Sequence, residues 1–205
     1  MPKHIQILGC FVLLAACPES FAQTILHPPA NRGVICWQEG VKLRWKDFQA
    51  VNYPADGRDA LDIRVGACCA SEVSVLPYKD DKGKPNFLVE SVFIKNKSWV
   101  RDSSLLINKV QLAHEQLHFD INELFARKIR LRIMQYYQAG RQVYGTELGQ
   151  EIRCLLEEQN ELNAWFDEEA HADPSVRRLQ KWQAIVGREL RALKPFQSTA
   201  ATCGQ

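Results

Sequence analysis

Three residues near the middle of the chain have the types and the spacing of a zinc site. His114, Glu115 and His118 follow one another in the order His-Glu-x-x-His. On a helix, residues four apart lie one turn above each other on the same face, so both imidazoles could bind one metal ion. The glutamate beside the first histidine could then act as general base on a zinc-bound water. The motif therefore predicts Zn²⁺ as cofactor and Glu115 as catalytic residue.

A catalytic zinc usually has three protein ligands, and the motif supplies only two. The acidic and imidazole side chains that could provide the third lie downstream: Asp120, Glu147, Glu169 and His171. We choose His171, because imidazole is the commonest metal-binding side chain and because we expect this residue in a polar break between two helices. Glu169 is the alternative ligand, and Asp167 or Glu168 could orient an imidazole.

The amino terminus has the features of a secretory signal. Basic residues precede an apolar run of about a dozen residues, 5–16, and Ser20-Phe21-Ala22 offers small side chains to a signal peptidase. The run is too short for a membrane-spanning helix, which needs about twenty apolar residues. We expect cleavage after Ala22 and a secreted or periplasmic protein. The alternative is a membrane-anchored lipoprotein, because residues 14–17 resemble a lipobox with Cys17 as the acylated residue.

Length and composition fit one globular domain after this signal. The chain has 205 residues, of which 46% are hydrophobic and 24% are charged, enough for a single core. We therefore expect a signal peptide at 1–22 and one domain at 23–205. The net charge of +2 gives no electrostatic case for nucleic acid as a partner.

Cysteine usage is consistent with export, because disulfides persist outside the cytosol. Of seven cysteines, five follow the expected cleavage point: Cys36, Cys68, Cys69, Cys154 and Cys203. The order of the chain does not determine their connectivity. Pairing of Cys154 with Cys203, and of Cys36 with Cys68 or Cys69, would each join parts of similar predicted structure. One thiol would then be left over or would pair outside the chain.

The elements that must position the motif fall into two groups along the chain. Alternation of apolar and polar residues predicts strands at 34–37, at 41–45, within 60–78 with an interruption near Gly66, and at 87–94. Asp, Gly and Pro residues at 79–85 predict a turn before the last of these strands.

A period of about 3.6 residues replaces the alternation after residue 101. It predicts a long helix from 102–104 to Tyr137, a second helix after Gly145, and a third that starts at Asp173 and stops before Pro195. The fold class is therefore α+β: a small antiparallel sheet followed by the long His-Glu-x-x-His helix and two further helices, in a zincin-like arrangement.

Four blocks of the chain resemble a bacterial family of secreted zinc-dependent proteases that was long catalogued as a domain of unknown function. They are LRWKDF at 43–48, KSWV at 97–100, HEQLHFDINELFAR at 114–127 and FDEEAHAD at 166–173. The family has an aromatic-Asp-x-Glu segment and a histidine after the second helix. Phe166, Asp167, Glu169 and His171 match these residues, whereas Ala170 and Ala172 replace the family's Thr and Gly. The resemblance implies a zinc-dependent peptidase.

The predicted function is therefore hydrolysis of peptide bonds in a peptide or protein substrate, with zinc held by His114, His118 and His171. Glu115 would take a proton from the zinc-bound water and deliver it to the leaving amine. The alternative is a non-catalytic envelope protein with a structural zinc site or a partner-binding role. Three ligands and an open fourth position would favour the enzyme, and four protein ligands would favour the structural site.

Overall fold

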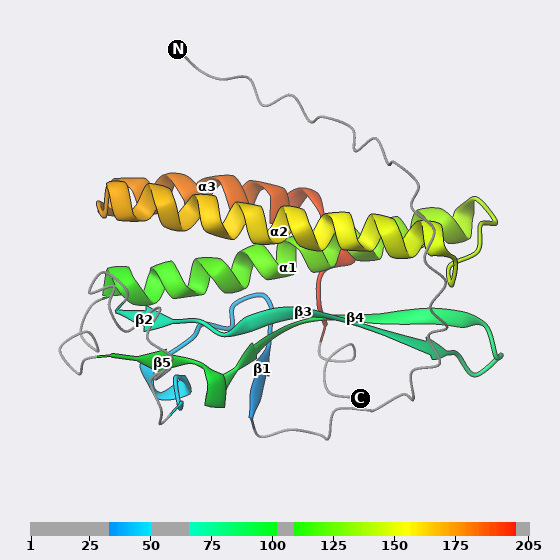
Figure 1. Cartoon of the computed structure of the whole chain (residues 1–205), viewed down its shortest axis with the longest axis horizontal. Coiled ribbons are helices and arrows are strands. Elements are labelled where there is room, and N and C mark those ends of the chain that lie inside the picture. The colour runs from blue at the N-terminus through cyan, green and yellow to red at the C-terminus, as the bar shows by residue number, and fades with distance from the viewer. Residues whose placement is uncertain (1–32, 51–65, 102–108, 200–205) are drawn as a thin grey trace, which may run out of the picture.

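Three helices lie over a layer of short strands in the computed structural model, which describes residues 33–50, 66–101 and 109–199 (Figure 1). The predicted α+β fold class is therefore confirmed. Several expectations fall outside the described residues: the signal peptide at 1–22, the anchor at Cys17, the strand pattern within 60–65, the helix start at 102–104, and Cys203.

The described strands form two antiparallel sheets. The larger has the order β1-β4-β3 and the smaller pairs β2 with β5. Their bounds are Val34–Cys36 (β1), Ala67–Cys68 (β2), Ser71–Lys79 (β3), Pro85–Ile94 (β4) and Trp99–Val100 (β5). The turn between β3 and β4 was predicted, and there the Asp80 carboxylate accepts hydrogen bonds from the backbone N–H groups of Lys82 and Lys84.

The predicted strand at 41–45 is wrong. The backbone N–H of Leu43 donates to Gln116 Oε1 at 2.8 Å instead of to a neighbouring strand, and Trp45–Asp47 form a short 3-10 helix. Leu43 is nevertheless buried, whereas Val41 is exposed. The alternation of apolar and polar residues at 41–45 therefore does not reflect a strand. It reflects the burial of Leu43 in an irregular segment that packs on a helix.

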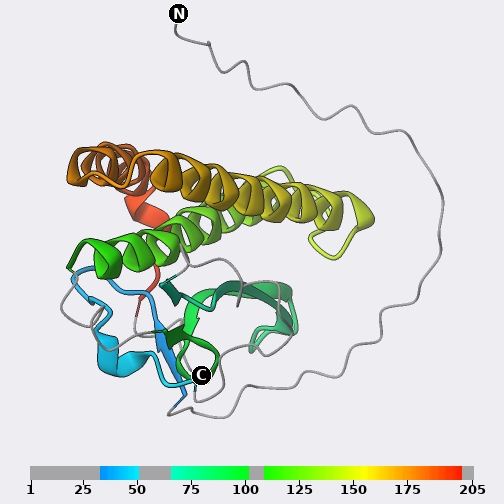
Figure 2. The ribbon, with the colours of Figure 1, turned by 60° about the vertical axis from the view of Figure 1, so that its left-hand side comes forward.

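The motif helix, α1 (Lys109–Gln138), lies between the strands below and the other two helices above (Figures 1 and 2). Its period of about 3.6 residues corresponds to a buried stripe, in which Ile121, Phe125 and Ile129 are at most 2% exposed. Side chains of this size each stabilise the fold by about 1.5–3 kcal/mol when buried. The predicted end is also confirmed, since Gly140 follows with a φ of +66°, which glycine adopts without strain.

The second and third helices, α2 (Thr146–Ala172) and α3 (Val176–Ala192), are antiparallel neighbours. The expected polar break before Asp173 is wrong, because α2 continues to Ala172 and its Glu and Ala residues are good helix formers. His171 is therefore on the last turn of α2. Asp173 is the C-cap of α2, and the N-cap of α3 is Ser175, whose side chain accepts a hydrogen bond from the N–H of Arg178.

The cysteines depart from the expected pairing. Cys36 is disulfide-bonded, whereas Cys68, Cys69 and Cys154 are thiols. The pairing of Cys36 with Cys68 or Cys69 is therefore wrong, and so is the pairing of Cys154 with Cys203. Within the described ranges, none of the helices has the length and apolar character needed to cross a membrane.

Candidate metal centre

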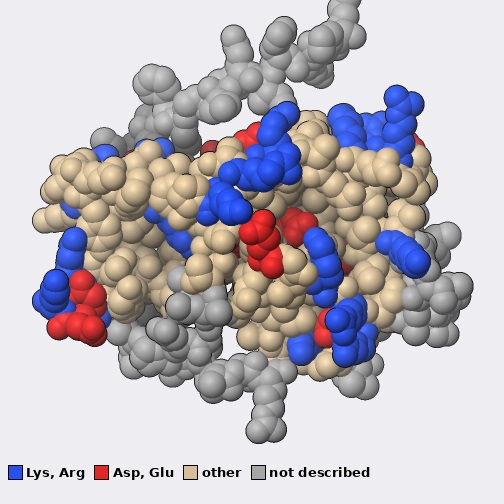
Figure 3. Space-filling model, turned by 180° about the vertical axis from the view of Figure 1, so that it is seen from behind, with Lys and Arg blue, Asp and Glu red and all other residues tan. Residues whose placement is uncertain are grey.

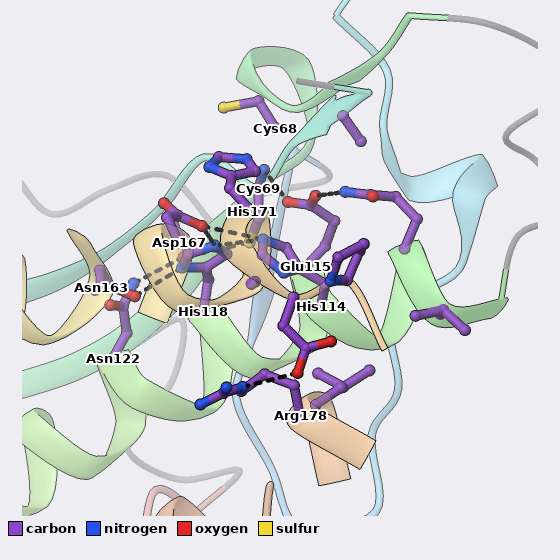
Figure 4. Close-up of a pocket in the computed structure, with 18 of the residues that line it drawn as sticks. Cys68, Cys69, His114, Glu115, His118, Asn122, Asn163, Asp167, His171 and Arg178 are labelled. Carbon is purple, nitrogen blue, oxygen red and sulfur yellow. Dashed lines mark hydrogen bonds and ion pairs between the residues drawn. The ribbon is translucent and has the colours of Figure 1, made fainter. Parts of the chain in front are cut away.

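A cleft of about 780 Å³ lies beside the amino-terminal half of α1 (Figure 4). The end of α2 and the start of α3 line it on one side, and β2 lines it on the other. All three motif residues, His114, Glu115 and His118, face this cleft, as do Asp167 and His171 from α2. The amino-terminal half of α1 therefore presents the predicted chemical groups to the cleft.

Three ligand atoms converge in the cleft. His114 Nε2 and His118 Nε2 are 3.1 Å apart, and Asp167 Oδ1 lies 3.1 Å from the first and 3.0 Å from the second. In a tetrahedral zinc site with bonds of about 2.0–2.1 Å, neighbouring ligand atoms are about 3.3–3.4 Å apart. The triangle therefore needs to widen by only about 0.3 Å to surround a zinc ion. Within the described residues, this trio alone forms such a metal-ligating group.

Phe166 packs against both imidazoles and so determines how α2 is placed relative to them. It is fully buried, and its ring centroid lies 4.5 Å from that of His114 and 5.1 Å from that of His118. Because Phe166 precedes Asp167 on α2, the contact that packs α2 against both imidazoles also brings the carboxylate to them. The ligand set thus depends on helix packing as well as on the motif.

The electrostatics of the cluster favour a positive charge at its centre. Burial lowers the pKa of His118, but the hydrogen bond and the charge of Asp167 outweigh burial and raise this pKa to about 9. Burial raises the pKa of Asp167, but hydrogen bonds from the two histidines hold it well below its usual value. Two imidazole nitrogens and a carboxylate oxygen are also ligand types that zinc prefers. The residues present therefore fit a zinc ion.

Glu115 is held at the edge of the cleft by two hydrogen bonds. Its Oε2 accepts from the backbone N–H of Cys69 at 2.9 Å, and its Oε1 accepts from Gln111 Nε2 at 2.6 Å. The residue is only 2% exposed, yet it lines the cleft. Both donors restrict the carboxylate to one orientation, which is what a general base requires.

His171, the predicted third ligand, lies one helical turn beyond Asp167 and lines the same cleft. It does not belong to the group of converging ligand atoms. Glu169, the alternative, is engaged elsewhere: its Oε2 accepts hydrogen bonds from Arg178 Nη1 at 2.8 Å and Trp182 Nε1 at 3.0 Å. The structure brings His114, Glu115 and His118 together, and leaves the role of His171 a prediction.

The remaining candidates lie away from the converging atoms. Asp120 Oδ1 accepts from Trp37 Nε1 at 2.8 Å and from Gln116 Nε2 at 3.0 Å. Glu147 forms an ion pair with Arg141 at the start of α2. The carboxylates of Asp120 and Glu147 are therefore bound to neighbouring side chains and do not join the group of converging ligand atoms.

Asp167 was considered from sequence only as a residue that could orient an imidazole. A pattern in the sequence could have indicated that Asp167 is more than an orienting residue. Gln159, Asn163 and Asp167 are spaced four residues apart and form a polar stripe along α2. Such a stripe on a packed helix indicates polar partners on the facing helix. The facing residues include His118, which contacts both Asn163 and Asp167.

Comparison of the chain with models of known protein families, with curated proteins and with solved structures found no match. The geometry and chemistry of the cleft are therefore the basis of the functional proposal.

Proposed function

We propose that the protein is an exported zinc metallopeptidase with a zincin-like arrangement of sheet and motif helix. His114, His118 and Asp167 would hold the zinc, and Glu115 would be the general base. The observation that carries the proposal is the convergence of three zinc-type ligand atoms, 3.0–3.1 Å apart, in a cleft that Glu115 also lines.

The number of ligands supports a catalytic site over a structural one. Structural zinc sites are closed by four protein ligands, whereas catalytic sites keep one position for water or substrate. Here three protein atoms converge, and the cleft of about 780 Å³ leaves room for a peptide beside them. The alternative of a structural zinc would need a fourth protein ligand at the same point.

The chemistry divides between the metal and the chain. When bound, zinc supplies a Lewis acid that activates water and polarises the carbonyl of the scissile peptide bond. Glu115 accepts the proton of the attacking water and then delivers it to the departing amine. The N–H of Cys69 and the amide of Gln111 hold the Glu115 carboxylate in place during both transfers.

The third ligand in this proposal is Asp167 in preference to His171. Asp167 Oδ1 already contacts both imidazole nitrogens, and this contact contributes most to raising the pKa of His118 against the effect of burial. His171 lines the cleft from one turn further along α2, where it could contact a substrate.

The experiment is a comparison of the mature protein with the Glu115→Gln variant. Zinc content is measured in both, and each is assayed on a broad peptide library. We expect both to retain zinc and the variant to lose about 10²–10⁴-fold in kcat, the usual contribution of a general base. Glu157→Gln, at an exposed glutamate of α2 outside the cleft, is the matched control and should cleave normally. Absence of cleavage by the unaltered zinc-loaded protein would refute the proposal.

A further inference from the structure

We infer that Asn163 is a positioning residue for His118: its side-chain oxygen keeps the imidazole hydrogen on Nδ1 and so leaves Nε2 to face the metal. The inference rests on the proposed role of His118 as a zinc ligand. It does not depend on peptidase activity, and it assigns a function to a residue that the zinc motif does not contain.

The hydrogen bonds of Asn163 determine which end of its amide meets the ring. Asn163 Nδ2 donates to the backbone carbonyl of Gln159 at 3.0 Å, one turn earlier on α2. The amide nitrogen is therefore turned away, and Oδ1 lies 2.7 Å from His118 Nδ1 (Figure 4). An amide oxygen can only accept, so Nδ1 must be the donor in this pair. In a neutral imidazole the lone pair then belongs to Nε2, the atom beside Asp167 and His114.

The spacing on α2 couples this contact to the third ligand. Asn163 and Asp167 are one turn apart on the same helix face, and both contact the same ring, at Nδ1 and at Nε2 respectively. One helix thus orients the imidazole from one side and completes the ligand group on the other. A shift of α2 along α1 would disturb both contacts together.

Buried amides continue the polar contact between the helices. Gln159 Nε2 donates to Asn122 Oδ1 at 2.5 Å, and Asn122 Nδ2 donates to Ser71 Oγ at 2.7 Å. Gln159 and Asn122 are 9% and 1% exposed, so a slip of either helix would leave buried polar groups unpaired. Ser71 also accepts from Cys69 Sγ at 3.4 Å, and the N–H of Cys69 holds Glu115. The network therefore ties the ligand His118 and the base Glu115 to one framework.

The test compares zinc affinity, by competition with a chromophoric chelator, in Asn163→Leu, Asn163→Ala and Asn163→Asp. Removing the acceptor in the first two should weaken zinc binding about 10–100-fold, the usual effect of losing a partner that orients a ligand. Asn163→Asp keeps an acceptor of the same shape and should bind zinc at least as tightly as the unaltered protein. Asn160→Leu, at an exposed position of the same cleft, is the control and should leave affinity unchanged.

A second measurement separates positioning from a merely structural role. Ring ¹⁵N chemical shifts of His118 in the zinc-loaded protein should show hydrogen on Nδ1 and zinc on Nε2, and Asn163→Ala should lose this preference. Thermal melting of the metal-free variants shows whether each variant is folded. If Asn163→Leu does not fold, Asn163→Ala is used as the test variant. Unchanged zinc affinity in a folded Asn163→Ala variant would overturn the inference.

Failure of this inference and failure of the proposed function have different signatures. Tight zinc binding that depends on Asn163, without any peptide cleavage, would refute the peptidase and keep the positioning role. Absence of zinc binding by the unaltered protein would overturn both. Cleavage by an Asn163→Ala variant that binds zinc normally would overturn only the positioning role.

Discussion

At the scale of single residues, Asp167 as third ligand would set the net charge of the proposed zinc centre. Two neutral imidazoles and one carboxylate would leave a bound Zn²⁺ with a net charge of +1, whereas three imidazoles would leave +2. Asp167 already stabilises positive charge here, as the raised pKa of His118 shows. The Asp167 side chain is partly exposed in the cleft.

The Asp167→Asn variant tests this assignment. It keeps the shape of the side chain but removes the charge, and we expect zinc affinity to fall by more than about 100-fold, the upper end for residues that only orient a ligand. His171→Ala should change affinity only a few-fold, and Glu169→Gln should do the same, because Glu169 is paired with Arg178. Chelator competition measures all three variants. A larger loss in His171→Ala than in Asp167→Asn would restore His171 as the third ligand.

The motif residues could be predicted from sequence because their relation is local. The rise and twist of a helix place His114 and His118 on one face without knowledge of any other element. Asp167 comes from a different helix, so its place depends on how far α2 is shifted along α1. That shift results from packing, in particular of Phe166 against the imidazoles, and a single sequence does not reveal it.

At the scale of elements, packing of the buried face of α1 fixes the positions of the proposed ligands. Ile121 lies in the core cluster that includes Phe166 and Leu117, directly beyond His118 along the helix. We expect Ile121→Ala to lower the free energy of unfolding by about 2–5 kcal/mol, because it removes buried methyl groups and leaves a cavity. Urea unfolding of the metal-free protein measures this change. Gln135→Ala, at an exposed position of α1, should stay within about 0.5 kcal/mol, and an equal loss there would contradict the argument.

Element predictions succeeded where periodicity reflects a face packed on the core. The strands β3 and β4 and the amphipathic α2 were anticipated for this reason, whereas the turn between β3 and β4 and the end of α1 were anticipated from Asp, Gly and Pro residues. The strand at 41–45 failed because alternation does not distinguish a strand from an irregular segment that packs on a helix through Leu43. The predicted break before Asp173 failed because polar residues on the open side of a cleft do not interrupt a helix.

At the scale of the whole molecule, the end of the chain secures the helix that carries the site. Glu123 on α1 is fully buried, and its carboxylate accepts from Arg127 Nε at 2.8 Å, from the N–H of Ser198 at 2.8 Å and from Ser198 Oγ at 2.6 Å. Arg130 adds a hydrogen bond of 2.6 Å to the carbonyl of Phe196. The segment that follows α3 is thus tied back across α1, which restricts movement of the motif helix.

Charge is dispersed over the face opposite to that of Figure 1. Lys and Arg lie there in several separate groups, with Asp and Glu among them (Figure 3). This distribution agrees with the small net charge of +2 and gives that face no continuous basic surface.

Zinc would join α1 to α2, so its binding should stabilise the whole fold. A ligand that binds only the folded state adds about 2.7 kcal/mol at a concentration 100 times its Kd. For a protein of 150–250 residues, about 2–4 °C accompanies each kcal/mol, so Tm should rise by about 5–11 °C. Thermal melting with and without zinc measures the shift, and excess chelator should reverse it. His118→Ala, which removes one ligand, is the control: a zinc-dependent rise of the same size in this variant would show that the metal binds elsewhere.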